Sequence, residues 1–397
     1  MQTLINISER LLLATTTTFA RYLYHDISWE ERLIGLIGAK GTGKTTMLLQ
    51  HIKQHFPEKQ KALYASLDNI WFSKNSLWDL AEQFNAYGGT HLFLDEVHKY
   101  PSWAREIKNI YDSFPDLSVV FTGSSMLEIY RQGVDLSRRV ISYELKGLSF
   151  REFLEFEYNL KLKKHSLEDI LNHHREIANA IIFDFKILPA FKKYLQIGYY
   201  PFYKNSKANY YYAIQQIINK TLEEDFPAIE QIEYATVLKL KKMLAIISGM
   251  VPYQPNTVEL AASMETARQL VVKYLHLLDR AGLLMCIQDT KERLNALSKP
   301  NKVYLENTNI IYSLARDNAN QGNIRETFFA NQLRAKHNIN TAKNGDFVVD
   351  EQYTFEIGGR NKTGEQIKNT SRAFVVADDI ESGFQNKIPL WLFGFLY

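Results

Sequence analysis

The stretch Gly38-Ala-Lys-Gly-Thr-Gly-Lys44-Thr45 decides the fold class of this chain, because it fits the phosphate-binding pattern G-x-x-x-x-G-K-[ST] at every fixed position. The glycines let backbone N–H groups close around the α- and β-phosphates of a nucleotide, with no Cβ in the way. Lys44 can then reach the β- and γ-phosphates, and the Thr45 hydroxyl can bind Mg²⁺. The pattern predicts these nucleotide-binding residues: Gly38, Ala39, Lys40, Gly41, Thr42, Gly43, Lys44, Thr45 and Thr46.

The segments on either side of this loop support the same interpretation. The run from Arg32 to Ile37 predicts a buried strand leading into the loop, and the residues from Thr45 to His55 predict the helix leaving it. The N-terminus of that helix would face the bound anion. A glycine-rich loop between a strand and a helix is the context expected of a true phosphate-binding loop.

The region from 32 to 145 alternates short apolar runs with helical segments, which is typical of a parallel sheet with crossover helices. The run His91–Asp95 is one expected strand, and Glu96 follows it directly. Ligands bind at the carboxyl ends of such strands, so Asp95 is expected to hold Mg²⁺ and Glu96 to act as the general base toward water. Strands are expected at 32–37, 62–67, 91–95, 118–122 and 140–145.

Two further segments contain catalytic candidates. Ser124 or Thr122, at the end of the fourth expected strand, could sense the γ-phosphate or steady the attacking water; the alternative is an ordinary strand-to-turn segment. Arg139 precedes the last expected strand and could stabilise transition-state charge, in its own chain or from a neighbouring subunit. The alternative is that Arg138 and Arg139 form a solvated pair at the start of a strand.

Length and composition narrow the class of protein further. A chain of 397 residues predicts two to four domains. It contains no apolar run of about 18 residues, so no membrane span is expected, and its start lacks the pattern of a signal peptide. Cys286 is the only cysteine, which excludes an intrachain disulfide and a zinc site made of several cysteines, and predicts a cytoplasmic setting. The net charge of +3 gives no whole-chain argument for nucleic-acid binding.

Residues 236–306 have a helix-turn-helix pattern followed by a probable hairpin, which predicts a winged helix. Asn256 can cap a second helix at Thr257–Ser263, and a third is expected over Glu265–Ala281, with Leu270 on its apolar face and Gly282 at its end. We expect DNA contacts from the polar face of the third helix, and the alternative is a protein-interaction or packing module. The candidate DNA-binding residues are Thr266, Arg268, Gln269 and Lys273.

The C-terminal segment has the acidic pattern of a restriction-endonuclease-like fold. Glu326 lies on an expected helix, Asp346 at a hairpin and Glu356 on the next strand, and such carboxylates bind Mg²⁺ in active nucleases. At the position two residues after Glu356, where a lysine is expected, the chain has Gly358, and Arg360 or Lys362 would have to substitute for that lysine. The polar and apolar residues of 353–357 also alternate poorly for a buried central strand. We therefore expect a nuclease-like fold that has lost its activity.

These segments in order resemble a bacterial and archaeal family of predicted AAA+ ATPases, in which an AAA domain is followed by the domain of unknown function 4143. The resemblance implies a sheet in which the strand before Ser124 lies between the P-loop strand and the Asp95 strand. It also implies that ATP is the nucleotide, because a P-loop alone does not separate ATP from GTP. The family arginine aligns with Arg139, although Arg138 stands where the family has glycine. The resemblance rests on Gly38–Thr46, Leu67-Asp68, Phe93–His98, Phe121–Ser125, Leu136–Arg139, Leu145–Leu154, Gly198–Pro201 and Glu224-Asp225.

Five parts are expected: an N-terminal helix in 1–30, a P-loop ATPase domain in 31–150, a helical lid or linker in 151–235, a winged helix in 236–310 and the nuclease-like α/β domain in 311–397. The N-terminal part is expected to be one amphipathic helix over residues 3–24. The expected function is Mg²⁺-dependent ATP hydrolysis coupled to the C-terminal half and associated with double-stranded DNA. The alternatives are a nucleotide-controlled protein-interaction switch with slow turnover and an ATP-regulated metal-dependent nuclease. A protein partner or further copies of the chain remain open, and no membrane is expected.

Overall fold

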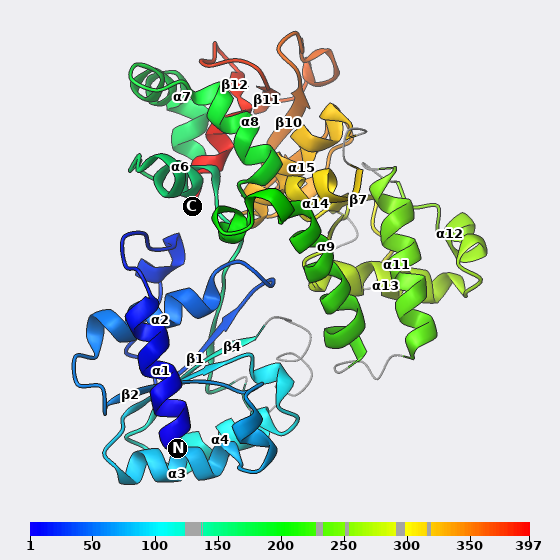
Figure 1. Cartoon of the computed structure of the whole chain (residues 1–397). Helices are drawn as coiled ribbons and strands as arrows, with labels where there is room; N and C mark the ends of the chain where they lie inside the picture. The colour runs from blue at the N-terminus through cyan, green and yellow to red at the C-terminus, as the bar shows by residue number, and fades with distance from the viewer. Residues whose placement is uncertain (124–135, 137, 228–232, 251–253, 291–297, 316–318) are drawn as a thin grey trace. The chain divides into compact units, whose positions relative to one another are not determined.

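The computed structural model describes residues 1–123, 136, 138–227, 233–250, 254–290, 298–315 and 319–397. The chain divides into two compact units, Met1–Gly147 and Leu148–Tyr397. The first unit, blue to cyan in Figure 1, is a sheet between helices. The second, green to red, contains helices and a second sheet.

The sheet of the first unit has five strands, all parallel, in the order β2-β3-β4-β1-β5. All five strands expected from the apolar runs are confirmed, and so is the place of β4 between the P-loop strand β1 and the Asp95 strand β3. The α/β fold class of this unit is therefore correct. The strands are β1 (Leu33–Ile37), β2 (Ala62–Ser66), β3 (His91–Asp95), β4 (Ser118–Gly123) and β5 (Ile141–Glu144).

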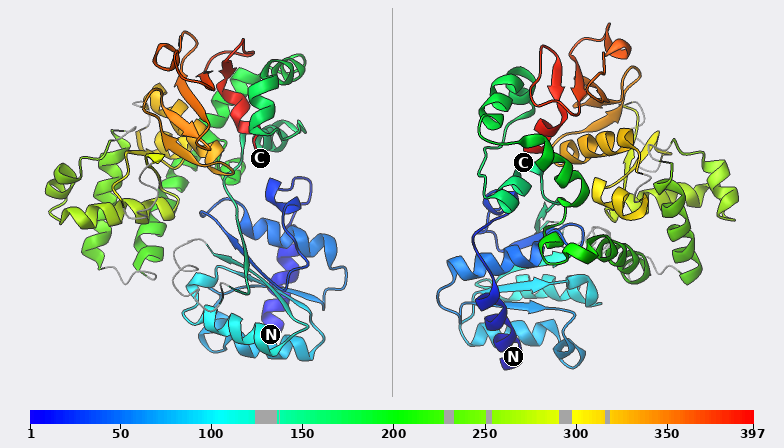
Figure 2. Two further views of the ribbon diagram at one scale, coloured as in Figure 1. Left: turned by 180° about the vertical axis from the view of Figure 1, so that it is seen from behind. Right: turned by 45° about the horizontal axis from the view of Figure 1, so that its top comes forward.

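Helices cover both faces of this sheet, which explains why β1 is buried along its whole length and β2, β3 and β4 along most of theirs. The edge strand β5 is exposed or half-buried. Leu33 of β1 packs into a core with helices α3 and α4, while the next residue, Ile34, packs into a core with helix α2. Figures 1 and 2 show α2 on one side of the sheet and α3 and α4 on the other. The helical elements are α1 (Gln2–Ala14), η1 (Tyr22–His25), α2 (Lys44–His55), η2 (Ile70–Ser73), α3 (Leu77–Ala86), η3 (Val97–Lys99) and α4 (Trp103–Ser113).

The N-terminal helix is shorter than the sequence predicts. A single helix was expected over residues 3–24, but α1 ends at Ala14 and Thr15 is already extended. Residues 15–18 are four threonines, whose branched side chains lose rotamer freedom in a helix. The chain therefore leaves the helix there and returns to helical geometry only in η1.

The second unit begins with a helix-rich segment, as expected for 151–235. Ser149 and Ser166 start two of the helices with capping boxes, in which the serine side chain accepts an N–H bond and an acidic residue three positions later closes the pair. The elements are α6 (Phe150–Tyr158), α7 (Leu167–Ile182), α8 (Ile187–Ile197), η4 (Pro201–Lys204), η5 (Lys207–Asn209), α9 (Tyr210–Lys220) and the π-helical turn η6 (Thr221–Asp225).

The next elements are α11 (Tyr234–Ser248), α12 (Thr257–Ser263), α13 (Arg268–Arg280) and the antiparallel strands β6 (Leu284–Ile287) and β7 (Lys302–Leu305). This order of three helices followed by an antiparallel pair agrees with the pattern expected for residues 236–306. Asn256 caps α12, and Gly282 follows α13 with a left-handed φ of 69°, both as expected. The third helix begins three residues later than expected, and Leu270 is exposed while Val271 is buried.

The last part is a mixed sheet with the order β12-β11-β10-β9-β8. Its centre is β10, which we expected to be a poor central strand because its polar and apolar residues do not alternate. That expectation was wrong, because β10 pairs with a parallel strand and is buried over four consecutive residues, so alternation is not needed. The elements are α14 (Thr308–Ala315), α15 (Gln321–Arg334), β8 (Ile339–Thr341), β9 (Phe347–Val349), β10 (Tyr353–Gly358), η9 (Glu365–Ile367), β11 (Ala373–Ala377), β12 (Lys387–Pro389) and η10 (Leu390–Phe395).

Candidate nucleotide-binding site

The phosphate-binding loop has the backbone that its glycines predict. Gly38, Gly41 and Gly43 all have positive φ values, of 150°, 82° and 99°. A Cβ on Gly38 would lie 2.3 Å from the carbonyl oxygen of Leu145, directly after β5. Glycine is therefore required at this position both for the backbone angle and for the close approach of a neighbouring chain segment.

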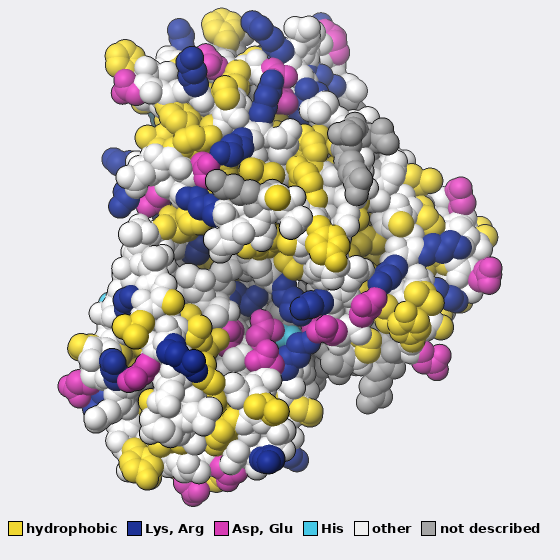
Figure 3. Space-filling model, in the orientation of Figure 1, with side chains coloured by type: hydrophobic (Ala, Val, Ile, Leu, Met, Phe, Trp, Pro, Cys, Tyr) yellow, Lys and Arg dark blue, Asp and Glu magenta, His cyan; other side chains and the backbone are white. Residues whose placement is uncertain are grey.

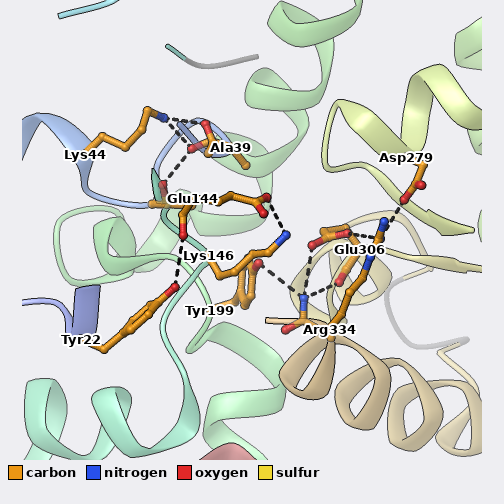
Figure 4. Close-up of polar contacts among 12 residues, drawn as sticks. Tyr22, Ala39, Lys44, Glu144, Lys146, Tyr199, Asp279, Glu306 and Arg334 are labelled. Carbon is orange, nitrogen blue, oxygen red and sulfur yellow. Dashed lines mark hydrogen bonds and ion pairs between the residues drawn. The ribbon is translucent and has the colours of Figure 1, made fainter. Parts of the chain in front are cut away.

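Lys44 is the first residue of α2 and its side chain is turned back over the loop. Its Nζ donates hydrogen bonds to the carbonyl oxygens of Gly38 and Ala39, at 2.7 and 3.0 Å (Figure 4). Thr42 also donates to Ala39, at 2.9 Å. The ammonium group thus lies against the loop backbone, where the motif places the phosphates of a nucleotide.

Asp95, at the end of β3, is buried and accepts hydrogen bonds from three hydroxyl groups. Thr45 of α2 and Tyr64 of β2 each donate to Oδ2 at 2.7 Å, and Thr122 of β4 donates to Oδ1. The sequence predicted that Thr45 and Asp95 would meet, and the structure brings them together. Hydroxyl and carboxylate oxygens are the ligands that Mg²⁺ prefers, so this pair fits the predicted metal site.

Tyr64 is a member of this site that the motifs did not reveal. Burial, together with the neighbouring Asp95 carboxylate, raises the pKa of its phenol far above the ordinary value. The hydroxyl therefore stays protonated and remains a donor to Asp95. The only signal in the sequence is a tyrosine inside an apolar strand, since a buried phenol needs a hydrogen-bond partner.

Glu96 is held in a distinctive geometry. Its φ is 52°, a left-handed conformation that is uncommon for a residue with a side chain and that occurs often at functional sites. Its backbone N–H donates to Thr122 at 3.1 Å, and its Oε2 lies 3.3 Å from Nε2 of His98. His98 is buried, so it can fix the orientation of the Glu96 carboxylate.

The two remaining catalytic candidates are Ser124 and Arg139. Ser124 lies outside the described residues, whereas Thr122 contacts Asp95 as described above. Arg139 pairs with Asp112 of α4, with Nε–Oδ1 and Nη2–Oδ2 distances of 3.0 and 3.1 Å. Arg139 comes just before β5, which runs parallel to β1. It therefore lies at the end of the sheet where the strands begin, whereas the P-loop lies at the end where they finish. A role for Arg139 at the P-loop of its own chain is therefore wrong.

Arg21 is a second residue of the site that no sequence motif revealed, and it holds the P-loop by hydrogen bonds to backbone carbonyl groups. It is buried, and its Nη1 donates to the carbonyl oxygen of Thr42. Its Nη2 donates to the carbonyl oxygens of Lys146 and Gly147, at 2.8 and 2.9 Å. One guanidinium group thus joins the P-loop to the last residues of the first unit.

In the second unit, the candidate DNA-binding residues lie at the start of α13. Arg268, Gln269 and Lys273 are exposed, and Thr266 is half-buried just before the helix. The Nε of Arg268 donates to the Thr257 hydroxyl at 2.9 Å. The exposed Leu270 lies among them. Figure 3 shows hydrophobic side chains beside Lys and Arg side chains on the part of the surface formed by α11, α12 and α13.

The nuclease-like carboxylates are paired with lysines. The Nζ of Lys302 lies 3.9 Å from both Glu326 Oε2 and Asp346 Oδ1, and Tyr304 donates to Glu326 at 2.6 Å. Burial, followed by the negative charge of Asp346, raises the pKa of Glu326. A lysine ammonium therefore lies between two carboxylates that would share a metal in an active nuclease.

The third carboxylate, Glu356, is buried and lies 2.9 Å from the Nζ of Lys362. A Cβ on Gly358 would be 2.7 Å from Cδ of Lys362, so the lysine side chain fills the space that a side chain at 358 would need. Lys362 thus lies beside Glu356, in the space where a side chain at position 358 would lie. Within the described residues, the carboxylates of Glu326, Asp346 and Glu356 do not form a compact group of ligand atoms.

Comparison with protein families identifies the class of the first unit. Residues 30–154 match the model of an AAA domain, AAA_14, and this match agrees with the P-loop and the strand order. Residues 30–154 are thus similar to an AAA domain in sequence and in strand order. Residues 188–321 match a domain of unknown function, DUF8612, so the expectation of the domain 4143 was wrong. This match spans both sides of the expected domain boundary at 235/236.

Among curated proteins, the chain is similar to the uncharacterized protein MJ1637 of Methanocaldococcus jannaschii, with 26% identity over 280 residues. The match covers 67% of this chain and 58% of that relative, so the chain spans less than two thirds of the relative's length.

Three solved structures are also similar. They are AMPPCP-bound DnaA from Aquifex aeolicus (13% identity, TM-score 0.26, 68% of this chain and 86% of that one), a DNA replication initiation factor (11%, 0.27, 74% and 90%) and C. elegans PCH-2 (16%, 0.26, 39% and 43%). At these TM-scores the likeness supports no conclusion about what this chain does. In the described part of the chain, no helix has the length and apolar character needed to span a membrane.

Proposed function

We propose that this protein is a Mg²⁺-dependent ATPase. The observation that supports this most directly is the hydrogen bond between Thr45 and Asp95, beside a P-loop whose Lys44 lies over the backbone. This bond joins the start of α2 to the end of β3, 50 residues further along the chain, at the carboxyl ends of the strands, where nucleotides bind in such folds.

Each of these side chains has a distinct task in the proposed reaction. Lys44 and the loop N–H groups bind and orient the phosphates, and Thr45 and Asp95 hold Mg²⁺, which neutralises phosphate charge when it is bound. Glu96 orients the attacking water and accepts its proton, and the His98 contact keeps the carboxylate in one orientation. Tyr64 and Thr122 position Asp95 by donating to it.

The substitution Glu96→Gln tests the proposed base, because it removes the proton acceptor and preserves the size of the side chain. We expect the rate of ATP hydrolysis to fall by about 10²- to 10⁴-fold, with nucleotide binding retained. Glu82→Gln, at an exposed position of α3, is the matched control and should leave the rate unchanged. Hydrolysis at the normal rate by Glu96→Gln would show that the assigned base is wrong.

We further propose that the second unit binds double-stranded DNA through α13. Support comes from the order of three helices and a hairpin and from the exposure of Arg268, Gln269 and Lys273. The test is fluorescence anisotropy with labelled duplex DNA over a range of salt. Arg268→Ala and Lys273→Ala should each weaken binding and reduce the salt slope by about 1 if the residue contacts a phosphate. Unchanged affinity in both variants would contradict this assignment.

A protein-interaction switch is the second candidate, and the exposed apolar side chains on the same helices favour it. Tyr234 and Leu238 of α11, Val258 of α12 and Leu270 of α13 are all exposed. Apolar surface of this kind suits a protein partner better than a phosphate backbone. Steady-state ATP hydrolysis with and without DNA separates the two candidates. DNA stimulation that fades with salt supports the DNA-coupled ATPase, whereas slow turnover unaffected by DNA supports the switch.

We propose that the ATPase is a homo-oligomer in which Arg139 acts on the nucleotide of a neighbouring copy, since it lies away from its own P-loop. The proposal of a homo-oligomeric ATPase is tested by mixing two inactive variants. Glu96→Gln retains Arg139, and Arg139→Ala retains Glu96, so mixed oligomers should regain part of the activity. If Arg139→Ala is fully active by itself, the arginine has no catalytic role.

A further inference from the structure

A separate group of side chains in the second unit has the composition of a metal site. His276 and Asp279 are three residues apart on α13, and Cys286 lies on the adjoining strand β6. One ligand atom from each of the three lies within 4.8 Å of the other two. All three side chains are half-buried, so the group is shielded but not closed to solvent.

Neighbouring groups orient each of these side chains, and the Cys286 thiol donates to the carbonyl oxygen of Leu275 at 3.6 Å. The Nε2 of His276 lies 2.8 Å from the carbonyl oxygen of Ser298, and a hydrogen bond there leaves the Nδ1 lone pair for a cation. Asp279 Oδ1 lies 2.7 Å from Nη1 of Arg334 and accepts the Cys286 N–H at 3.4 Å, which leaves Oδ2 available. Such partners for the ring nitrogen and the carboxylate are usual around metal ligands.

The charges around the group can accommodate a divalent cation. Figure 4 shows Arg334 between Asp279 and Glu306, whose Oε2 lies 3.6 Å from its Nη1. Two carboxylates and one guanidinium group have a net charge of −1. A divalent metal together with a Cys286 thiolate would bring this set to neutrality. Cys286 and Arg334 also line a surface hollow, which provides a route for an ion.

We propose that His276, Asp279 and Cys286 bind a divalent transition metal of the zinc type, with water in a fourth position. A nitrogen, an oxygen and a sulfur ligand suit Zn²⁺ and disfavour Mg²⁺, which prefers oxygen alone. On binding, the S–H bond of Cys286 breaks, the sulfur–metal bond forms and the proton leaves to solvent, with no change of oxidation state. The site is distinct from the P-loop and does not depend on the proposed ATPase activity.

The single cysteine of the chain makes this proposal directly testable with Co²⁺ as a probe. Full-length reduced protein is titrated with Co²⁺ without nucleotide, and the thiolate-to-cobalt charge-transfer band is followed in the near ultraviolet. We expect one equivalent to produce the band, Zn²⁺ to remove it by displacement, and Cys286→Ser to lack it. His276→Gln should weaken Co²⁺ binding by at least about tenfold. Co²⁺ bound at the P-loop would give no thiolate band.

His337→Gln is the matched control, because His337 lines the same hollow but pairs with Asp350 outside the ligand group. This variant should retain the band, and thermal melts check that each variant is folded. If Cys286→Ser does not fold, the rate of Cys286 alkylation in the unaltered protein decides, since Zn²⁺ should slow it at least tenfold. The proposal is overturned if Co²⁺ gives no thiolate band, or if Zn²⁺ leaves the alkylation rate unchanged.

Discussion

Arg21 provides a sharp test of how the P-loop is held in place. The substitution Arg21→Met removes the guanidinium group and retains an apolar side chain of similar length. The carbonyl oxygens of Thr42, Lys146 and Gly147 then each lose a hydrogen-bond donor. Because Arg21 is only 4% exposed, water cannot replace these bonds without a rearrangement of the loop.

The expected cost follows from the number and kind of these bonds. A hydrogen bond from a charged donor contributes about 1.5–3 kcal/mol to stability. The three bonds contribute less than three times this amount, because the carbonyl oxygens of Lys146 and Gly147 share Nη2 and the bond to Lys146 is only partly buried. We therefore expect the free energy of unfolding to fall by about 3–5 kcal/mol. If about 1.4 kcal/mol of this loss acts on the loop geometry, the affinity for an ATP analogue falls about tenfold.

Urea denaturation and titration with a fluorescent ATP analogue measure these two effects. Arg10→Met is the matched control, because Arg10 is an exposed arginine of α1 whose Nε donates to the carbonyl oxygen of Asn6 in the same helix. Arg21→Lys should give an intermediate result, since a lysine retains the charge but cannot donate in the same fork geometry. If Arg21→Met unfolds within about 0.5 kcal/mol of the unaltered protein, the inferred role of Arg21 is refuted.

Three further predictions concern buried polar groups. Tyr64→Phe removes one of the donors to Asp95 and should lower the free energy of unfolding by about 1.5–3 kcal/mol in urea; no change would show that the hydrogen bond does not stabilise the fold. Lys362→Met leaves the Glu356 carboxylate buried without its partner and should cost about 3 kcal/mol, most of which Glu356→Gln in the same chain should restore in a double-mutant cycle. Burial lowers the pKa of His51 from 6.5 to about 3, so the unfolded chain takes up a proton that the folded chain does not. Stability should therefore fall as the pH decreases from 6.5 toward 3, by at most about 1.4 kcal/mol per pH unit, and an equal pH slope in His51→Gln would contradict this.

Local sequence patterns predicted much of the first unit and several details of the second. The apolar runs located every strand of the parallel sheet, and the positions of Asn256 and Gly282 marked two helix ends. Each of these features depends on the conformational preferences of a few consecutive residues. The threonine run after Ala14 contained a similar local signal, which outweighed the amphipathic pattern on which the longer helix was based.

The sequence by itself determined the P-loop, its strand and helix, and the acidic end of β3, because the glycine, lysine and carboxylate positions there are set by local backbone geometry. Only the tertiary structure decided which side chains complete the site. Tyr64 reaches Asp95 across 31 residues and Arg21 reaches Lys146 across 125 residues, and no local pattern specifies such partners. The direction of β5 likewise decided that Arg139 lies at the N-terminal ends of the strands, away from the P-loop at their C-terminal ends. Contacts between distant segments depend on how the strands are ordered and paired, which is a property of the whole fold.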